Sequence, residues 1–346
     1  MLFAPVSIVL ALAGVTTVEG VVEAQQARWD GGMIVTRSTV RVDRVVAGAA
    51  PAVLVIEHHG GSLDGYGQHM SSEATLILGE PVTLDVELDG AQWRIAGGIH
   101  GKHDRHGPFA FVRTSTLSAI ACQGRAPHSL YWNRLDVALT FDDAYSADIA
   151  ADADTQAALT ASMTTWNAVT CSYLKLGDAG TITAAPVGYV PGGPNYNAVK
   201  WIETSWPENR QAIAATLTTF ECDTGKLVDA DVLFNGEDFT FTVEPDLLPT
   251  AADVENTMTH ELGHLVGFDH SPDPQSTMYA EAPLGETIKR DLTADDAAGM
   301  CDVYTVGEEP DLDGGCCGTG AGGGRGSAAL AAAVAAMLVT RRRRRA

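Results

Sequence analysis

Three histidines and a glutamate between His260 and His270 could carry out metal-dependent chemistry. The stretch reads His-Glu-x-x-His-x-x-Gly-x-x-His, and His260 and His264 are four residues apart. On a helix, residues at this spacing share one face, so both imidazoles can bind one metal ion. Glu261 follows the first histidine, where its carboxylate can take a proton from an attacking water. Three neutral imidazoles with one open position are typical of a catalytic zinc site.

The residues around this motif predict the helix that would carry it. A capping pattern at Thr250 and Asp253 is followed by a helix-compatible run that extends to Gly267. Glycine adopts left-handed conformations without a Cβ clash, so Gly267 can end the helix and return His270 to the metal. Apolar residues at three- and four-residue spacing would face a core: Val254, Met258, Leu262 and Leu265.

Met278 stands eight residues after His270, in the sequence Ser-Thr-Met-Tyr. With the histidine motif, this resembles the metzincin zinc endopeptidases, in which a methionine turn forms an apolar floor under the metal ligands. Ser271, directly after the third histidine, is similar to the matrixin family of that clan. The resemblance covers about residues 131–305 and implies peptide-bond hydrolysis with one catalytic Zn²⁺. It implies these site residues: the ligands His260, His264 and His270, the general base Glu261, and the structural residues Gly267 and Met278.

The resemblance also implies a fold. The expected class is α+β, a matrixin catalytic domain over residues 119–306 with a twisted mixed sheet and a long active-site helix, preceded by a small all-β domain. Alternating apolar residues predict a first strand at Asp136–Phe141, and helical spacing predicts a long helix over Asp148–Val169. Leu227–Asn235 alternates again and resembles the edge strand above the cleft, so a peptide substrate is expected to pair there, near Asp229–Asn235.

Leu292–Tyr304 resembles the final matrixin helix, with Thr293 and Asp296 as a cap. Two features depart from the family. No histidine lies between Cys171 and Thr259, so a second, structural zinc is not expected. The Pro-x-Tyr wall of the specificity pocket is replaced by Ala-Glu-Ala at residues 280–282, so substrate preference does not carry over.

A separate unit is expected over residues 25–118, because the 346-residue chain has room for a second domain. Residues 82–88 alternate between apolar and polar, and Asp89 and Gly90 then form a strong hairpin signal, which predicts a small β-rich domain. Such a domain could be a propeptide, a substrate-binding module or a spacer. One loop collects residues that could bind a metal, although an exposed polar loop is the commoner origin: His100, His103, Asp104 and His106.

Both ends of the chain predict export. An apolar run at residues 2–16 predicts a signal peptide over residues 1–24, cleaved after its last residue, with a buried N-terminal strand as the alternative. Residues 307–346 contain a Gly-rich linker with Cys316 and Cys317, then an apolar stretch of 14 residues and five arginines. This resembles MYXO-CTERM sorting tails, which implies a sorting protease and the membrane as partners. A permanent short anchor is the alternative.

The charge excludes one class of partner. Six of the 22 basic residues follow residue 315, so the rest of the chain carries 16 basic against 44 acidic residues. Such a surface repels nucleic acid and suits a saline exterior, where salt screens self-repulsion. Matrixins often hold structural Ca²⁺, and Asp229 and Asp231 are candidate ligands. A solvated strand edge is the commoner origin of such a pair.

Four cysteines precede the tail: Cys122, Cys171, Cys222 and Cys301. An even number in an exported chain predicts two disulfides, with three possible pairings. The alternative is a switch in which the Cys122 thiolate caps the zinc, but the residues around Cys122 share little with the matrixin switch.

The sequence therefore predicts a secreted or cell-surface zinc endopeptidase that cleaves extracellular proteins or peptides. The alternative, from another class, is a catalytically inactive surface adhesin that keeps a zinc site. An intact Glu261 argues against it, because a purely structural site needs no base.

Overall fold

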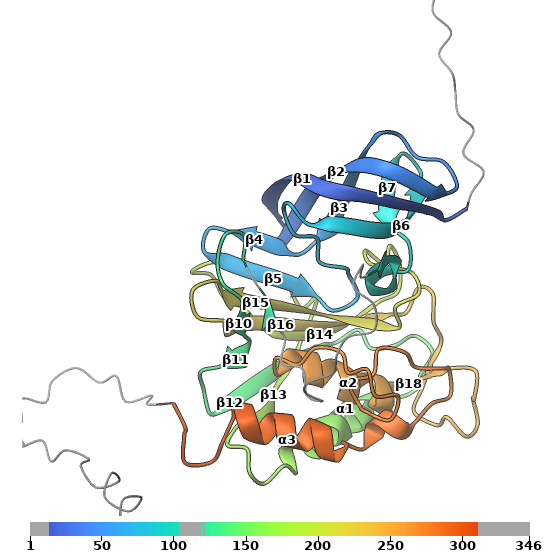
Figure 1. The fold of residues 1–346 in the computed structure, drawn as a ribbon. Helices are drawn as coiled ribbons and strands as arrows, with labels where there is room; N and C mark the ends of the chain where they lie inside the picture. The colour runs from blue at the N-terminus through green and yellow to red at the C-terminus, as the bar shows by residue number, and fades with distance from the viewer. Residues whose placement is uncertain (1–13, 104–118, 121, 311–346) are drawn as a thin grey trace, which may run out of the picture. The chain divides into compact units, whose positions relative to one another are not determined.

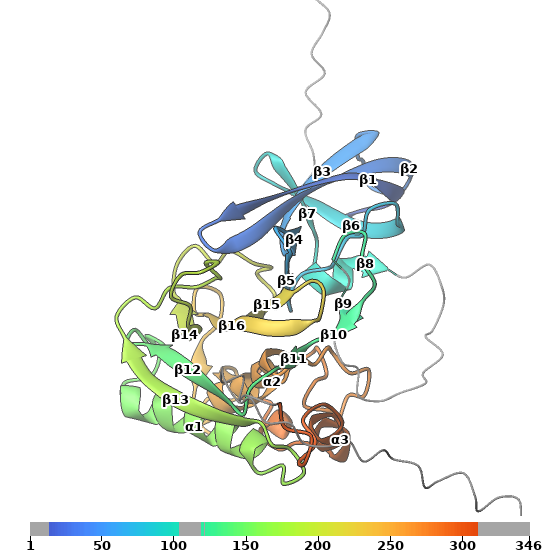
Figure 2. The same ribbon diagram turned by 90° about the vertical axis from the view of Figure 1, so that its left-hand side faces the viewer.

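The computed structural model describes residues 14–103, 119, 120 and 122–310 (Figures 1 and 2). Two sheets dominate this part of the chain, and three α-helices pack against the second sheet. The predicted α+β class, with an all-β unit ahead of a mixed sheet, is confirmed. The described residues through Pro310 form one compact unit.

The first sheet, here called the N-terminal sheet, contains strands from the first third of the chain. A long antiparallel hairpin starts it, and alternate residues of its strands are buried, because successive side chains point to opposite faces. Its order is β1 (Thr16–Asp30), β2 (Met33–Ala47), β3 (Val53–His59), β7 (Gln92–Ile95), β6 (Pro81–Asp89) and β8 (Lys102–His103), with β1 also paired to β6.

Strand β1 conflicts with the predicted cleavage after Ala24. The strand already begins at Thr16, and the side chains of Val18 and Val22 are fully buried in the core of the N-terminal sheet. A cut after Ala24 would remove both side chains and expose their partners, so that cleavage point is wrong for this fold. Strand β1 includes only the last residue of the apolar run at residues 2–16, so it does not decide between a leader and a buried strand for that run. Residues 1–13 lie outside the described part of the chain.

The second sheet, here called the main sheet, contains the strands of the matrixin-like region. Its interior strands run parallel, and β15 runs antiparallel to β16. Its order is β13 (Lys175–Ile182), β12 (Asp136–Asp142), β14 (Asn197–Ile202), β16 (Lys226–Asn235), β15 (Ala214–Glu221), β5 (Tyr66–Met70) and β4 (Gly61–Leu63), and β11 (Tyr131–Trp132) also pairs with β16. Two short ribbons join β9 (Ala119–Ile120) to β10 (His128–Ser129) and β17 (Phe241–Thr242) to β18 (Ala252–Asp253).

The predicted edge strand is wrong. Strand β16, which contains the stretch expected to bind substrate, pairs with β14 on one side and with β15 on the other. Its backbone groups are used on both sides, so it cannot accept a further strand. The outer strand of the matrixin-like region is β15 (Ala214–Glu221). Its sequence, Ala-Ala-Thr-Leu-Thr-Thr-Phe-Glu, shows no regular alternation of apolar and polar residues and so did not indicate a strand.

Three helices pack on one side of the main sheet: α1 (Asp152–Asn167), α2 (Val254–Leu265) and α3 (Ala294–Val303) (Figure 1). The 3₁₀ turns are η1 (Gly98–Gly101) and η2 (Ile288–Arg290). Helix α1 is shorter than the predicted Asp148–Val169, and its Trp166 indole donates to the Thr259 carbonyl of α2 at 2.8 Å. Helix α3 begins with the predicted capping box of Thr293 and Asp296.

The hairpin β4–β5 leaves the N-terminal sheet and joins the main sheet (Figure 2). Strand β5 pairs antiparallel with β15, with Met70 opposite Leu217 and Tyr66 opposite Glu221. Gly67 faces the ring of Phe220 so closely that a Cβ there would overlap it, so only glycine allows this approach. The two sheets are therefore connected through β15.

Two disulfides are present, as predicted. They join Cys122 to Cys222 with a Cα–Cα distance of 5.6 Å, and Cys171 to Cys301 at 5.2 Å. The cysteine-switch alternative is wrong for this structure, because Cys122 has a disulfide partner. Within the described residues no helix is long and apolar enough to cross a membrane. The predicted sorting residues Cys316 and Cys317 lie outside the described part of the chain.

Candidate metal centre

Helix α2 is buried along its whole length, which fixes the position of the ligands it carries. Its N-cap is Asp253, whose carboxylate accepts from the Asn256 N–H at 2.8 Å, so the cap lies three residues later than the pattern at Thr250 predicted. Arg290 donates two hydrogen bonds to the same carboxylate, one from Nε at 2.8 Å and one from a terminal nitrogen at 2.6 Å. The paired charge anchors the start of α2 to η2.

Gly267 turns the chain as predicted. Its φ is +101°, a conformation that only glycine adopts easily, and a Cβ there would overlap the carbonyl of Leu130. The Phe268 N–H bonds back to the Gly263 carbonyl at 2.9 Å, which closes the end of α2. The chain then returns towards the helix and brings His270 beside the other two histidines.

The three predicted ligands converge. The Nε2 atom of His264 lies 3.2 Å from that of His260 and 3.1 Å from that of His270. Imidazoles bound to one tetrahedral zinc at about 2.0–2.1 Å hold their nitrogens roughly 3.3 Å apart. The donor atoms therefore fit a single zinc ion, and these three form the one such group among the described residues.

Backbone carbonyls orient two of the rings. Nδ1 of His260 lies 2.7 Å from the Thr277 carbonyl, and Nδ1 of His264 lies 2.9 Å from the Phe268 carbonyl. A carbonyl only accepts, so each Nδ1 carries the proton and each Nε2 presents a lone pair to the metal position. Burial lowers the pKa of all three ligands, to about 4 for His264, which keeps them neutral.

Met278 lies under this centre, as the resemblance implied. A Cβ on Gly263 would overlap the Met278 sulfur, so the thioether packs directly on the backbone of α2. The turn is held by Asp296, whose carboxylate accepts from the Ser276 hydroxyl at 2.9 Å and from the Thr277 N–H at 3.1 Å. Asp296 also caps α3, so one buried side chain positions both the turn and the helix.

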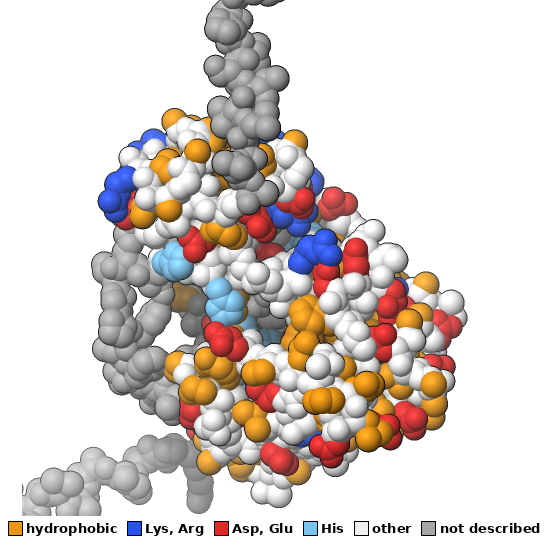
Figure 3. Space-filling model, turned by 90° about the vertical axis from the view of Figure 1, so that its right-hand side faces the viewer, with side chains coloured by type: hydrophobic (Ala, Val, Ile, Leu, Met, Phe, Trp, Pro, Cys, Tyr) orange, Lys and Arg blue, Asp and Glu red, His pale blue; other side chains and the backbone are white. Residues whose placement is uncertain are grey.

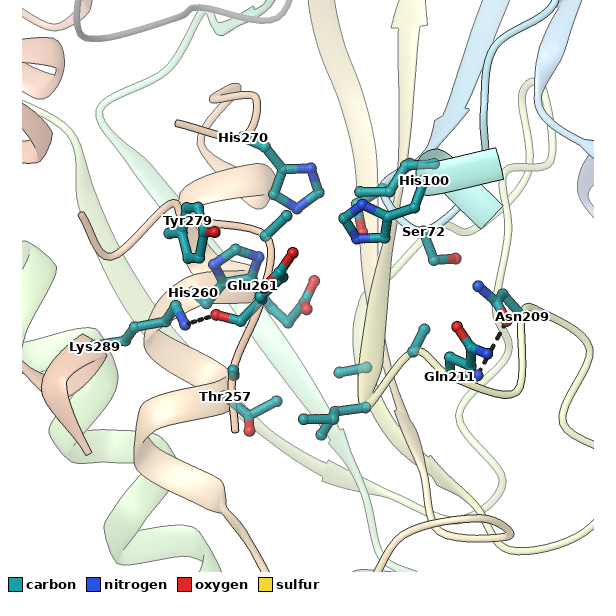
Figure 4. Close-up of a pocket in the computed structure, with 18 of the residues that line it drawn as sticks. Ser72, His100, Asn209, Gln211, Thr257, His260, Glu261, His270, Tyr279 and Lys289 are labelled. Atoms are coloured by element: carbon teal, nitrogen blue, oxygen red, sulfur yellow. Dashed lines mark hydrogen bonds between the residues drawn. The ribbon is translucent and has the colours of Figure 1, made fainter. Parts of the chain in front are cut away.

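Glu261 is 4% exposed and points to the same position as the ligands (Figure 4). The Thr216 hydroxyl donates to its Oε2 at 2.6 Å, and the Ser71 hydroxyl also bonds to the carboxylate. Burial raises the pKa of Glu261 to about 7, and these two hydrogen bonds oppose the shift. A carboxylate with this pKa can both accept and return a proton near neutrality. Sequence reasoning missed Ser71 and Thr216, because no local pattern links them to Glu261.

A cavity of about 390 Å³ lies in front of Glu261. One wall carries His260, His270 and Tyr279, and the facing wall carries Ser72 and His100 (Figure 4). In Figure 3, histidine side chains gather where this face of the molecule is hollowed.

The loop that was considered as a second metal site begins with His100 and His103, and these two histidines have different neighbours. His100 is exposed and borders the cavity, while His103 pairs with Asp85 at 2.8 Å. The loop therefore does not bring these two together. Asp104 and His106 lie outside the described residues.

Asp229 and Asp231 are buried, so the expectation of a solvated strand edge is wrong. Asp231 accepts from the N–H groups of Gly188 at 2.6 Å and Ala198 at 2.8 Å. Burial and the neighbouring Asp231 raise the pKa of Asp229, so the pair retains a proton. A shared proton lowers the negative charge of the pair, and the arrangement gives no support to a calcium ion there.

Comparisons with known proteins agree with this geometry. The family model of the matrixins matches residues 138–305. Metalloendoproteinase 1-MMP of Arabidopsis thaliana is 41% identical over 76 residues, which is 21% of this chain and 20% of that protein. Metalloendoproteinase 2-MMP of the same plant is 41% identical over 64 residues, 18% of this chain and 16% of that protein. The chain thus spans about a fifth or less of the length of these relatives. Residues 138–305 form a matrixin-like domain.

Proposed function

We propose that this chain is a zinc-dependent endopeptidase that hydrolyses peptide bonds in extracellular proteins or peptides. One observation carries the proposal: the Nε2 atom of His264 lies 3.2 Å from that of His260 and 3.1 Å from that of His270, and this group stands beside the buried carboxylate of Glu261. A structural zinc site would be closed by a fourth protein ligand, whereas this one has three ligands and a cavity in front of it.

His260, His264 and His270 would hold the zinc ion through Nε2. When bound, the ion supplies Lewis acidity, which polarises a peptide carbonyl and acidifies water. Glu261 takes the proton of the attacking water and delivers it to the leaving amine nitrogen. Thr216 holds the Glu261 carboxylate in place through its 2.6 Å hydrogen bond, so the base needs no reorientation before it acts.

The burial and orientation of Glu261 argue against the alternative of an inactive zinc-containing adhesin. A buried carboxylate is costly unless it has a use, and here it faces the open side of the ligands and the cavity. A relic site would lose nothing if this residue were replaced by a neutral one. No observation favours the adhesin over the peptidase.

We also propose that the protein is exported to the cell surface or secreted. The two disulfides support an oxidising compartment, and the acidic composition suits a saline exterior. A removable leader compatible with β1 would have to end before Thr16. Recognition of the tail by a sorting protease and the membrane remains part of this proposal. Intact mass of the exported protein measures both ends, and a mass that includes Arg341–Arg345 would contradict removal of the tail.

Cleavage of casein or gelatin, with and without a chelator, tests the peptidase proposal. We expect hydrolysis, either by the intact chain or by a chain cut in its N-terminal region with trypsin that is then inhibited, and this hydrolysis should disappear when the metal is removed and return when zinc is added back. Hydrolysis that survives complete metal removal would contradict the proposal.

A further inference from the structure

The outer edge of β15 is already occupied by the chain itself. Five residues of β5 pair with β15 from Leu217 to Glu221. The pairing continues for one more residue, because the Ser71 N–H donates to the Thr216 carbonyl at 3.0 Å and the Thr216 N–H donates to the Ser71 hydroxyl at 2.9 Å. An extended peptide binds a sheet edge through these same backbone groups. From Thr216 to Glu221 they are therefore not available to a substrate.

The same segment reaches the catalytic residues. Ser71 directly follows β5, and its hydroxyl bonds to the Glu261 carboxylate. Ser72 lines the cavity, and its carbonyl accepts from the Ile99 N–H of η1 at 3.1 Å. Residues 66–72, here called the blocking strand, thus cover the substrate edge at one end and contact the general base at the other.

The first feature that holds the blocking strand in place is the side chain of Gln68. Gln68 accepts from the Ile34 N–H and donates to the Gly32 carbonyl at 2.9 Å and to the Thr219 hydroxyl at 3.0 Å. This side chain is 2% exposed, so each lost partner would leave a buried polar group unsatisfied.

Two further contacts join the surroundings of the blocking strand to the matrixin-like domain. His59 of β3 pairs with the buried Glu208 at 2.6 Å. Burial lowers the pKa of His59, but the hydrogen bond and the charge of Glu208 outweigh it, so the pKa is raised overall. The disulfide from Cys122 ends at Cys222, whose N–H donates to the Gly65 carbonyl just before β5. The blocking strand is therefore built into the sheet rather than laid loosely over it.

We propose that the blocking strand keeps the enzyme latent by taking the place of an extended peptide on β15. This inference rests on the proposed peptidase function. The ordinary chain would bind a small zinc-chelating molecule in the cavity, which stays open in front of Glu261, but would exclude an extended peptide. Activity would require the blocking strand to leave β15, by a partner that binds it or by cleavage within the N-terminal unit.

The test compares three full-length, zinc-loaded variants with the ordinary chain. Gln68→Ala removes the hydrogen bonds that hold the blocking strand and touches no catalytic residue. Gly67→Val prevents the close approach to Phe220 and opens the same edge by a different route. The matched control is Gln25→Ala, which removes a glutamine bonded to the Ser38 hydroxyl and the Leu76 carbonyl inside the N-terminal unit, away from β15.

Two quantities are measured for each protein: the cleavage rate of a quenched fluorescent peptide, and hydrogen–deuterium exchange at the amides of residues 214–221. We expect Gln68→Ala and Gly67→Val to cleave the peptide about tenfold faster or more, with faster exchange in β15, while Gln25→Ala behaves as the ordinary chain. Circular dichroism and zinc content identify any variant that has not folded. If Gln68→Ala or Gly67→Val does not fold, the other of these two variants provides the test.

The outcomes separate the two proposals. If the ordinary chain cleaves the peptide as fast as both opened variants, the blocking strand does not cause latency, and the peptidase proposal stands. If an opened variant holds zinc and exchanges rapidly at β15 but no variant cleaves any peptide, the peptidase proposal fails and this inference fails with it.

Discussion

The two walls of the cleft differ in how far apart their parts lie in the sequence. In the catalytic wall, residues 254–279, the contacts that orient the ligand rings join near neighbours: the Nδ1 contact of His260 to Thr277 spans 17 residues, and that of His264 to Phe268 spans four. The facing wall depends on distant partners, and the bond from Gln68 to Thr219 spans 151 residues. A local wall leaves a signature in the sequence, whereas a wall built by strand pairing does not. The two walls also differ in their proposed roles: the catalytic wall carries the metal ligands and the base, and the facing wall limits the access of substrate.

The strongest test of the catalytic wall is Glu261→Gln in the Gln68→Ala chain. The amide cannot accept the proton of the attacking water, and loss of a positioned base costs about 10²–10⁴-fold in rate. Zinc content should be unchanged, because the three histidines are intact. Peptide cleavage and metal analysis measure both. A variant that holds zinc and cleaves within a few fold of its parent would falsify the assigned role of Glu261.

The two disulfides allow a direct comparison between the walls. Cys122–Cys222 lies beside the blocking strand, and Cys171–Cys301 lies within the matrixin-like domain. Replacing either pair by alanine should lower the free energy of unfolding by roughly 2–4 kcal/mol. Only loss of the first pair should also raise peptide cleavage, because it frees the segment that holds β5. Equal effects of the two replacements on cleavage would show that the disulfide does not support latency.

Gly263→Ala tests how tightly the catalytic wall is packed. The added methyl would overlap the Met278 sulfur, and over-packing of a dense core costs about 1–3 kcal/mol. Chemical denaturation should show this loss, together with weaker zinc binding, because Met278 supports the turn that orients His260. Gly177→Ala, at a glycine with open space around it, is the control and should change little. A Gly263→Ala protein as stable as its parent would mean that the turn can move aside.

Glu73→Gln tests the residue that directly follows the blocking strand. Burial, followed by the charge of Glu208, raises the pKa of Glu73 to about 7, while His59 and Arg94 lower it. The folded protein therefore holds this proton more tightly than the unfolded chain. The resulting stability is present below about pH 4.5 and is lost as the pH rises towards 7.

Removing that ionisation should make Glu73→Gln more stable than its parent at pH 8, on the order of 1–2 kcal/mol, with little difference near pH 4. Unfolding measured at both pH values decides, with the exposed Glu87→Gln as the control. A variant that is destabilised equally at both pH values would show that Glu73 is needed for its hydrogen bonds rather than penalised for its charge.

The sequence predicted what depends on local spacing. The ligands, the base, the turn at Gly267 and the box at Thr293 and Asp296 follow from short motifs, and all lie where expected. Local patterns could not distinguish edge strands from interior strands. For this reason β16 was mistaken for the edge strand of the matrixin-like region, whereas the edge strand is its partner β15. The cleavage point after Ala24 rested on small residues alone, and composition could not show that Val18 and Val22 are buried in a strand.

The residues missed at the site have the same physical origin. Ser71 and Thr216 reach Glu261 only because β5 pairs with β15, and strand pairing at such separation has no signature in a single sequence. The pairing of the cysteines was likewise open, since spacing does not determine which of four thiols meet.

The most direct test of the central claim is zinc X-ray absorption spectroscopy on the full-length protein loaded with one equivalent of zinc. The account predicts three imidazole nitrogens from His260, His264 and His270, a water oxygen in the open position, and no sulfur. Replacement of any one histidine by alanine should reduce the imidazole contribution to two. A sulfur neighbour, or a fourth imidazole in the ordinary chain, would contradict an open catalytic site with three histidine ligands.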